Sequence, residues 1–223
     1  GLSVEVVTSQ FYHTRKEKRD IADVIKDVSY KVTLLNEGSY QKNVSIRRLV
    51  SHKRFAKNVV NYLSRRKKPD VIYLFVPPAG LAKRVVNYAK KHNIRIVIDV
   101  LDLWPEAFEM FLPTAIAKFL LYPMKRAVEF AYKNADEIIA VSKTYVQRAI
   151  KCNPHKNIGH SVFIGTDIGY FDKIAKHAPS LSGKIRPITM TYIGMLGHSY
   201  DLCGVMDAMR LLIDKGNDDV ELL

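Results

Sequence analysis

The sequence has little cysteine and no long apolar run, and each shortage excludes a class of protein. It has 223 residues and 2 cysteines, Cys152 and Cys203, which lie far apart. This excludes a disulfide-stapled secreted scaffold and predicts reduced thiols in a cytoplasm. No apolar run is long enough to span a bilayer. The segment from Gly1 to Thr8 has the pattern of a strand and not of a signal peptide, so we expect a cytoplasmic protein.

The familiar cofactor and catalytic motifs are also missing. No Gly-x-Gly-x-x-Gly follows a strand, and there is no Walker loop, His-Glu-x-x-His or nucleophile elbow. Cys152, His155 and His160 could be read as three zinc ligands, but no fourth partner stands at finger spacing. We therefore expect neither a dinucleotide cofactor nor a metal.

Acidic residues are absent from one long tract, although the net charge of the chain is +13. Between Gly38 and Pro69 there is no acid. The basic residues there are Lys42, Arg47, Arg48, Lys53, Arg54, Lys57, Arg65, Arg66, Lys67 and Lys68. Apolar residues recur at helical spacing within the tract, which predicts a basic amphipathic helix near Ser51 to Arg66. Such a helix can lie on an anionic membrane or on a nucleic-acid backbone, or simply present a solvated basic face.

Hydrophobic residues make up 48% of the chain, enough for a packed core, and strand-like and helix-like segments alternate along it. Alternation of this kind predicts an α/β fold, a mostly parallel Rossmann-type sheet with helices on both faces. The predicted strands are 4–8, 31–35, 71–76, 94–99, 137–141 and 161–164. The predicted helices after the basic one are 81–92, a longer stretch 114–133 interrupted by Pro123, and one through Lys151 with Ser142 as N-cap.

A second unit is predicted after a linker. Residues 179–187 are rich in Pro, Ser and Gly, which separates a first domain, 1–178, from a second, 188–223. In the second we expect a strand from Ile188 to Ile193, a loop Gly194 to Gly197, a helix near Asp201 to Asp214 and a strand from Val220. That unit is only the beginning of a βαβ repeat and is too short to form a domain with its own hydrophobic core.

The most informative stretch runs from Asn93 to Glu106. A buried apolar strand there leads into Asp99 and Asp102, then into Trp104, the single tryptophan. Ligands of open α/β sheets bind beyond the carboxyl ends of strands, so these carboxylates are placed to hold a polar substrate. The alternative is that Asp102 caps the next element and Trp104 fills the core.

Four motifs occur in a familiar order: Asp99-Val-Leu-Asp102-Leu-Trp-Pro-Glu106, Ala135-Asp-Glu-Ile-Ile-Ala-Val-Ser142, Gly165-Thr-Asp167 and Tyr192-Ile-Gly-Met-Leu-Gly197. In this order the chain resembles the bacterial family 4 glycosyltransferases of the capsule and lipopolysaccharide O-chain type. The resemblance implies a GT-B fold of two Rossmann-like domains, a retaining mechanism and a nucleotide-sugar donor.

The resemblance also implies that the chain is part of a longer enzyme. Gly1 to Thr8 matches the second strand of the family, and the family's donor-binding domain continues beyond the position of Leu223. We therefore expect the 223-residue chain to be inactive by itself.

The resemblance assigns the site residues as well. Asp99 stands where many relatives have a histidine that meets the donor sugar, and Asp102 matches the aspartate of that pattern. Asp102 and Glu106 are then expected to orient the acceptor, because an ionised carboxylate accepts hydrogen bonds from hydroxyl groups. No nucleophile is assigned. His13, Trp104 and Ser142 are the expected acceptor or cleft residues, with a loop histidine without a role as the alternative for His13.

On the donor side the expected residues are Gly194, Gly197, His198, Gly165 and Asp167. A Gly-x-x-Gly loop before a helix lets backbone N–H groups approach a diphosphate, although a plain tight turn is the other interpretation.

The predicted function is therefore sugar transfer to a lipid-linked or saccharide acceptor, on the cytoplasmic side of an anionic membrane. The apolar residues expected at that surface are Phe108, Met110, Phe111, Leu112, Phe119, Leu120, Leu121 and Tyr122, with packing against the sheet favoured for Phe119 and Leu120. Two alternatives stay open. One is a basic nucleic-acid-binding protein, although the basic tract lacks the interleaved aromatic residues with which RNA-binding surfaces stack on bases. The other is a non-catalytic partner with the same fold.

Overall fold

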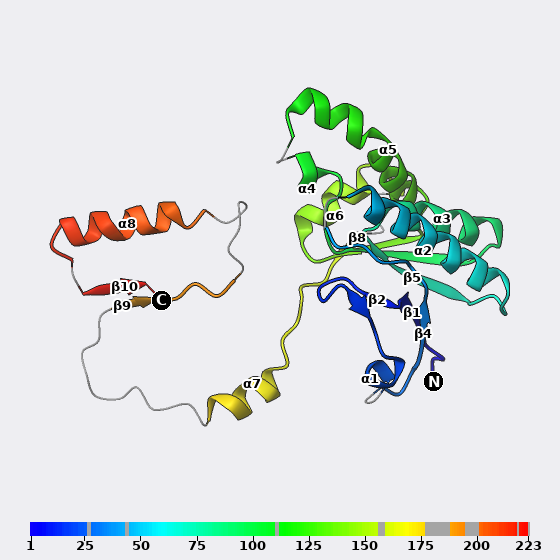
Figure 1. Cartoon of the computed structure of the whole chain (residues 1–223), viewed down its shortest axis with the longest axis horizontal. Helices are drawn as coiled ribbons and strands as arrows, with labels where there is room; N and C mark the ends of the chain where they lie inside the picture. The colour runs from blue at the N-terminus through cyan, green and yellow to red at the C-terminus, as the bar shows by residue number, and fades with distance from the viewer. Residues whose placement is uncertain are drawn as a thin grey trace. The chain divides into compact units, whose positions relative to one another are not determined.

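The computed structural model describes residues 1–25, 28–42, 45–109, 112–155, 159–176, 188–194, 201–217 and 219–222. The chain divides into two compact units, Gly1–Gly165 and Thr166–Leu223, which are described separately (Figure 1). The predicted linker, 179–187, lies outside the described residues.

The first unit is built on a parallel sheet of four strands. These are β5 (Val71–Val76), β6 (Arg95–Val100), β7 (Glu137–Ala140) and β8 (Gly159–Ser161), in the order β5-β6-β7-β8. The predicted bounds of β5 are confirmed, and those of β6 and β7 differ by one residue. The last strand begins at Gly159, two residues before the predicted start, and ends at Ser161.

One face of this sheet carries the core of the unit. Ile96, Ile98 and Ile138 are fully buried there, beneath α3 (Ala79–Lys91), α5 (Thr114–Lys133) and α6 (Lys143–Ile150). The alternate side chains of β5 point to the other face, where Tyr73 and Phe75 are about half exposed. This alternation follows from the two-residue period of a strand.

A second, two-stranded parallel sheet pairs β1 (Glu5–Ser9) with β4 (Lys31–Leu35). Between them lie a hairpin of β2 (Phe11–Tyr12) and β3 (Glu17–Lys18), and the short helix α1 (Ile21–Ile25). The helix α2 (Ile46–Ser64) connects this pair to the rest of the unit. Its Tyr62 donates a hydrogen bond to Glu5, and its Leu63 carbonyl accepts one from Tyr88 of α3.

Two helices differ from the prediction. The basic helix α2 starts five residues earlier than expected, because Ser45 is its N-cap and accepts a hydrogen bond from the Arg48 amide at 3.2 Å. The helix α5 is continuous through Pro123 instead of being interrupted there. Proline removes the N–H that would bond the carbonyl of Phe119, and Phe119 is exposed, so water can reach that part of the helix.

The second unit contains α7 (Ile168–Ala175), β9 (Ile188–Met190), α8 (Cys203–Asp214) and β10 (Val220–Leu222). The two strands pair in parallel, as predicted for a strand–helix–strand unit. Met209 of α8 is its one buried hydrophobic side chain among the described residues. None of the helices in the described part of the chain is long and apolar enough to cross a membrane.

Candidate functional site

Loops that follow the ends of three parallel strands come together in the first unit. The hairpin loop after β1 and β2 carries His13, the segment after β4 carries Tyr40, and the loop after β6 carries Trp104. Carboxyl ends of parallel strands are where open α/β sheets bind ligands. We call the residues gathered here the strand-end cluster: His13, Lys16, Tyr40, Arg48, His52, Asp102 and Trp104.

Tyr40 lies at the centre of the cluster. It is 4% exposed, and its hydroxyl is 2.8 Å from Nδ1 of His13. Lys16 lies 3.3 Å from the same histidine nitrogen and 5.0 Å from the centre of the Tyr40 ring. The ring of His52, from α2, packs edge-on against Tyr40 at 6.1 Å. The hairpin and the first half of α2 are thus held together through one buried phenol.

Arg48 joins this group to the predicted site residues. Its guanidinium lies 5.9 Å from the Tyr40 ring and 5.5 Å from the Trp104 ring, distances at which a cation is attracted to an aromatic face. The indole N–H of Trp104 donates to a carboxylate oxygen of Asp102 at 3.0 Å. The structure therefore brings His13, Asp102 and Trp104 into one cluster.

Both histidines of the cluster are held neutral. Burial is the largest cause that lowers the pKa of His52 to about 4, and the charge of Arg48 and the neighbouring imidazole of His13 lower it further. The carboxylate of Glu37, 3.7 Å from His52, favours the charged form, but burial outweighs it. Burial and the charges of Lys16 and Arg48 also lower the pKa of His13. At neutral pH the cations of the cluster are consequently Lys16 and Arg48.

Asp99 occupies a different position from Asp102. It lies within β6, opposite Phe75 in the register, and accepts a hydrogen bond from the Tyr73 hydroxyl at 2.7 Å. Burial, this hydrogen bond and the charge of Asp99 together raise the pKa of Tyr73 to about 12. The described contacts of Asp99 thus tie it to the half-exposed face of the sheet and not to Trp104.

Glu106, at the start of α4 (Glu106–Glu109), forms an ion pair with Arg148 of α6. Arg148 also lies 3.9 Å from Glu129 and 3.5 Å from the sulfur of Cys152. Burial opposes the charge of Arg148, but the hydrogen bond and charge of Glu106 raise its pKa overall. Contact of Glu106 with an acceptor would require this pair to open.

The remaining predicted residues are placed as follows. Ser142 is the N-cap of α6, as expected, and accepts from the Tyr145 amide. Asp167 is the N-cap of α7, Gly165 is exposed, and Gly194 lies against the side chain of Tyr192. Gly197 and His198 lie outside the described residues. Within the described part of the chain, no group of three or more His, Cys, Asp or Glu side chains could hold a metal ion.

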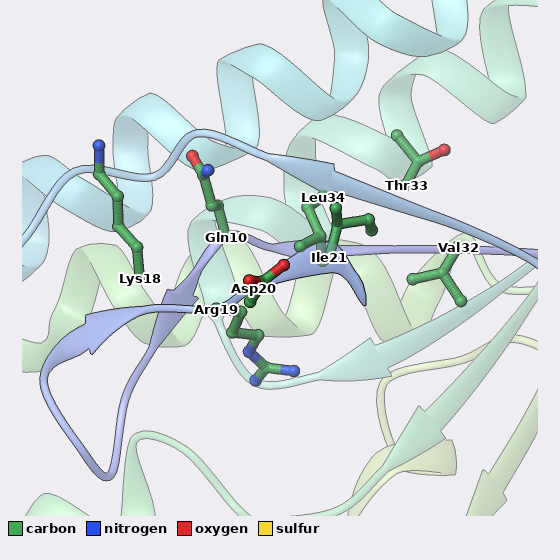
Figure 2. Close-up of a pocket in the computed structure, with 8 residues that line it drawn as sticks. All are labelled: Gln10, Lys18, Arg19, Asp20, Ile21, Val32, Thr33 and Leu34. Carbon is green, nitrogen blue, oxygen red and sulfur yellow. The ribbon is translucent and has the colours of Figure 1, made fainter. Parts of the chain in front are cut away.

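A hollow of about 680 Å³ lies elsewhere, beside β4 and the β2–β3 hairpin (Figure 2). None of the predicted site residues lines it. Its charged side chains Lys18, Arg19 and Asp20 point in different directions in Figure 2, so they do not converge on one ligand position. We therefore place the candidate site at the strand-end cluster. The hollow is lined by Gln10, Lys18, Arg19, Asp20, Ile21, Val32, Thr33 and Leu34.

Sequence reasoning missed Tyr40, Lys16, Arg48 and His52 as site residues. One signal could have indicated Arg48: it stands in the first turn of a helix that has no acid there, where acids are favoured. Tyr40 and Lys16 carry no comparable local signal, because their meeting depends on how two loops pack.

No family model matches the chain, and no curated protein matches it. Solved structures do. One is the HepE protein of Anabaena, crystallised with UDP-glucose. The match covers 98% of this chain and 68% of the HepE chain, with 11% sequence identity and a TM-score of 0.47. The Arabidopsis thaliana protein UGT89C1, crystallised with UDP, covers 99% of this chain at 12% identity, with a TM-score of 0.52.

At such low identity the second likeness shows the fold alone, and the chain spans 58% of the length of that protein. The chain therefore has the α/β fold of the GT-B glycosyltransferases, as its sequence predicted.

Proposed function

We propose that the chain belongs to a retaining glycosyltransferase that moves a sugar from a nucleotide donor to a lipid-linked or saccharide acceptor in cell-surface polysaccharide synthesis. The observation that carries the proposal is the strand-end cluster, in which Asp102, Trp104, His13 and Arg48 gather where this fold binds ligands. The Arabidopsis protein with this fold was crystallised with UDP, which supports a uridine or similar nucleotide donor.

Asp102 is the residue we propose to orient the acceptor. Its carboxylate is fixed by the indole N–H of Trp104, and it keeps lone pairs with which to accept a hydrogen bond from a sugar hydroxyl. Holding that hydroxyl close to the anomeric carbon of the donor sugar would supply rate by positioning. In this proposal Asp99 supports the sheet face through Tyr73, and Glu106 holds α4 against α6 through Arg148.

The donor residues are proposed from the family resemblance. Gly194, Gly197 and His198 would approach the diphosphate with backbone and imidazole N–H groups, while Gly165 and Asp167 shape the turn before α7. Stabilising the charge of the departing diphosphate would then supply a large share of the catalysis.

The acceptor is proposed to be presented at the cytoplasmic surface of an anionic membrane. On α2 the apolar residues Ile46, Leu49 and Val50 are 60–79% exposed and follow one another at helical spacing. On α5, Phe119 is 81% exposed and Leu120 58%, so the packing favoured for them from the sequence is wrong. Exposed apolar residues interspersed with Lys and Arg suit a lipid surface better than a nucleic-acid backbone.

The test of the proposal is an assay of the full-length protein with a panel of nucleotide sugars and lipid extracts from the source cells. We expect one nucleotide sugar to be consumed only when the extract is present, with release of the nucleotide diphosphate. The anomeric configuration of the product, read by NMR, tests retention. Absence of turnover with every donor, together with tight salt-sensitive binding to duplex or single-stranded nucleic acid, would favour the nucleic-acid alternative instead.

A further inference from the structure

We propose that Cys152 is a site of reversible oxidation by peroxides, at which Arg148 and Tyr132 bind the oxygen atom that is added to the sulfur. The thiol follows the end of α6 and is partly buried, and an N–H of Arg148 donates to its sulfur at 3.5 Å. The reacting molecule is a small peroxide, ROOH. The site is built from α5 and α6 and does not depend on the proposed sugar transfer.

Two carboxylates hold the guanidinium of Arg148 beside this sulfur. Its Nε donates to Glu106 of α4, and its Nη2 lies 3.9 Å from Glu129 of α5. Its Nη1 is the nitrogen that donates to Cys152. Because the guanidinium is a planar fork, it cannot turn away from the sulfur without breaking an ion pair. Negative charge that develops on an oxygen at Cys152 would therefore meet a fixed positive charge.

Tyr132 gives a second and independent reason for a bound oxygen. Its side chain is 1% exposed, and its hydroxyl has no hydrogen-bond partner among the residues that the structure describes. Buried hydroxyl groups in folded proteins are nearly always hydrogen-bonded, because an unpaired one is destabilising. The hydroxyl is thus a donor in search of an acceptor, and neutral Cys152 offers it only a weak one.

The hydroxyl faces the same space as the sulfur. Tyr132 stands three residues after Glu129 on α5, so both side chains lie on the helix face that meets Arg148. Asn153, the neighbour of Cys152, donates to the Tyr132 carbonyl at 2.6 Å. Burial raises the pKa of the Tyr132 phenol, the charge of Arg148 opposes this, and the charge of Cys152 adds to it. The phenol therefore keeps its proton at neutral pH and interacts with Cys152.

The oxidation balances with the peroxide as the only oxidant. An electron pair of the Cys152 sulfur attacks one oxygen of ROOH, so that an S–O bond forms and the O–O bond breaks. The thiol proton passes to the departing oxygen, which gives ROH and the sulfenic acid Cys–SOH, and two electrons move from sulfur to the peroxide. Arg148 stabilises the charge on the departing oxygen, and the new oxygen accepts from Arg148 and Tyr132. An external thiol condenses with the sulfenic acid to a disulfide with loss of water, and a second one restores Cys152.

The test treats the full-length protein with hydrogen peroxide, traps sulfenic acid with dimedone and quantifies each cysteine peptide by mass spectrometry. Cys203, which is exposed, is the reference thiol in the same sample. We expect the adduct at Cys152 to form about tenfold faster than at Cys203, because one hydrogen bond from a charged donor in the transition state corresponds to about that factor.

Tyr132→Phe is the decisive variant. It should slow oxidation of Cys152 by about threefold or more, which is the weight of one neutral hydrogen bond. The melting temperature of the reduced protein should stay the same or rise, because the hydroxyl that is removed has no described partner. The matched control is Tyr122→Phe, which removes an exposed hydroxyl from the same helix and should leave the rate unchanged.

Arg148→Lys keeps the positive charge but loses the fork, and it should also slow the reaction. Thermal melting establishes whether this variant is folded, and if it is not, Tyr132→Phe decides the matter. Oxidation of the wild type should leave its melting temperature unchanged, since the added oxygen gives the Tyr132 hydroxyl an acceptor. In Tyr132→Phe the same oxidation should lower the melting temperature.

Three results would overturn the proposal. Oxidation of Cys152 no faster than that of Cys203 would mean that the thiol is not activated. Equal rates in Tyr132→Phe and Tyr122→Phe would remove the phenol from the site. A fall in the wild-type melting temperature on oxidation would mean that the oxygen enters packed space without its donors. No readout is an enzyme assay, so each result stands even if the proposed sugar transfer fails.

Discussion

At the scale of single residues, the carboxylates predicted together from one motif take on separate tasks. Asp102 accepts from Trp104 in the strand-end cluster, Asp99 accepts from Tyr73 within the sheet, and Glu106 pairs with Arg148. The three lie within eight positions of sequence, and their different partners lead to different expectations for substitution.

Asp102→Asn should lower turnover of the full-length protein by about tenfold or more, because a hydrogen bond to a charged group contributes about 1.5–3 kcal/mol. The amide oxygen can still accept from the Trp104 indole, so the melting temperature should stay nearly unchanged. Steady-state kinetics and thermal melting check both statements, with the exposed Glu109→Gln as control. Wild-type turnover, or a large drop in melting temperature, would favour a capping role for Asp102.

Glu106→Gln should instead destabilise the fold. Arg148 keeps 21% of its side chain exposed and would lose the nearer of its two charged partners, keeping Glu129 at 3.9 Å, so we expect a cost of about 1–3 kcal/mol for a group at this depth. Urea unfolding should show the loss, and the Glu109→Gln variant should not. If Glu106→Gln unfolds like the wild type but loses turnover, the expectation from the resemblance, that Glu106 orients the acceptor, gains support over the structural role.

At the scale of elements, Glu5 determines how α2 is attached to the β1–β4 pair. Its carboxylate accepts from Thr33 and Tyr62 at 2.6 Å each, and it pairs with Arg66 and with Lys31. Burial raises the pKa of Glu5, but these hydrogen bonds outweigh burial and lower it to about 2. The ordinary value for such a group is near 4.5.

A carboxyl group whose pKa is lower in the folded state than in the unfolded state stabilises the protein at pH values above its unfolded-state pKa. That stabilisation is lost as the pH falls toward the folded-state pKa. The contribution of Glu5 should therefore be complete above pH 4.5 and disappear toward pH 2. Glu5→Gln should lower the free energy of unfolding at pH 7 by about 1.5–3 kcal/mol, and by progressively less in acid. Denaturant titrations from pH 7 to 3 measure this. The control is Glu17→Gln, which removes only an exposed contact with Arg15. If the difference in unfolding free energy between Glu5→Gln and the wild type stays constant with pH, the lowered pKa of Glu5 is contradicted.

At the scale of the whole first unit, the membrane-docking surface that we propose consists of the exposed Ile46, Leu49 and Val50 of α2 with Phe119 and Leu120 of α5. It involves only the first half of α2. The helix has 19 residues and is thus about 28 Å long. Its apolar start, at Ile46, therefore lies far from Arg65, Lys67 and Lys68, the cations that follow its last residue. That distance exceeds the screening length of about 8–10 Å at physiological salt. Arg66 is moreover committed to Glu5 and is unsuitable as a docking residue.

We therefore expect the protein to sediment with anionic vesicles, less so as salt rises, and weakly with neutral ones. Neutralising Arg47, Lys53 and Lys118 to Gln should weaken binding more than neutralising Arg65, Lys67 and Lys68, since each cation near the surface contributes about 1 kcal/mol. Phe119→Ser with Leu120→Ser should weaken it further. Equal binding to neutral vesicles, or an equal effect of the two triple variants, would contradict docking through this surface.

The sequence by itself determined the alternation of strands and helices, the bounds of β4 and β5, the Ser142 N-cap and the α/β fold of the GT-B class. These features are local, because apolar periodicity and capping residues are read within one turn or one strand. The sequence also indicated Asp102 and Trp104, since both stand next to a buried strand.

Only the tertiary structure decided what these residues meet. His13 and Tyr40 are 27 positions apart, and Glu106 and Arg148 are 42 apart, so no local pattern records either contact. Whether Phe119 is buried or exposed depends equally on which elements pack over α5. Loop packing at the strand ends, and not the pattern of any single segment, assembled the candidate site.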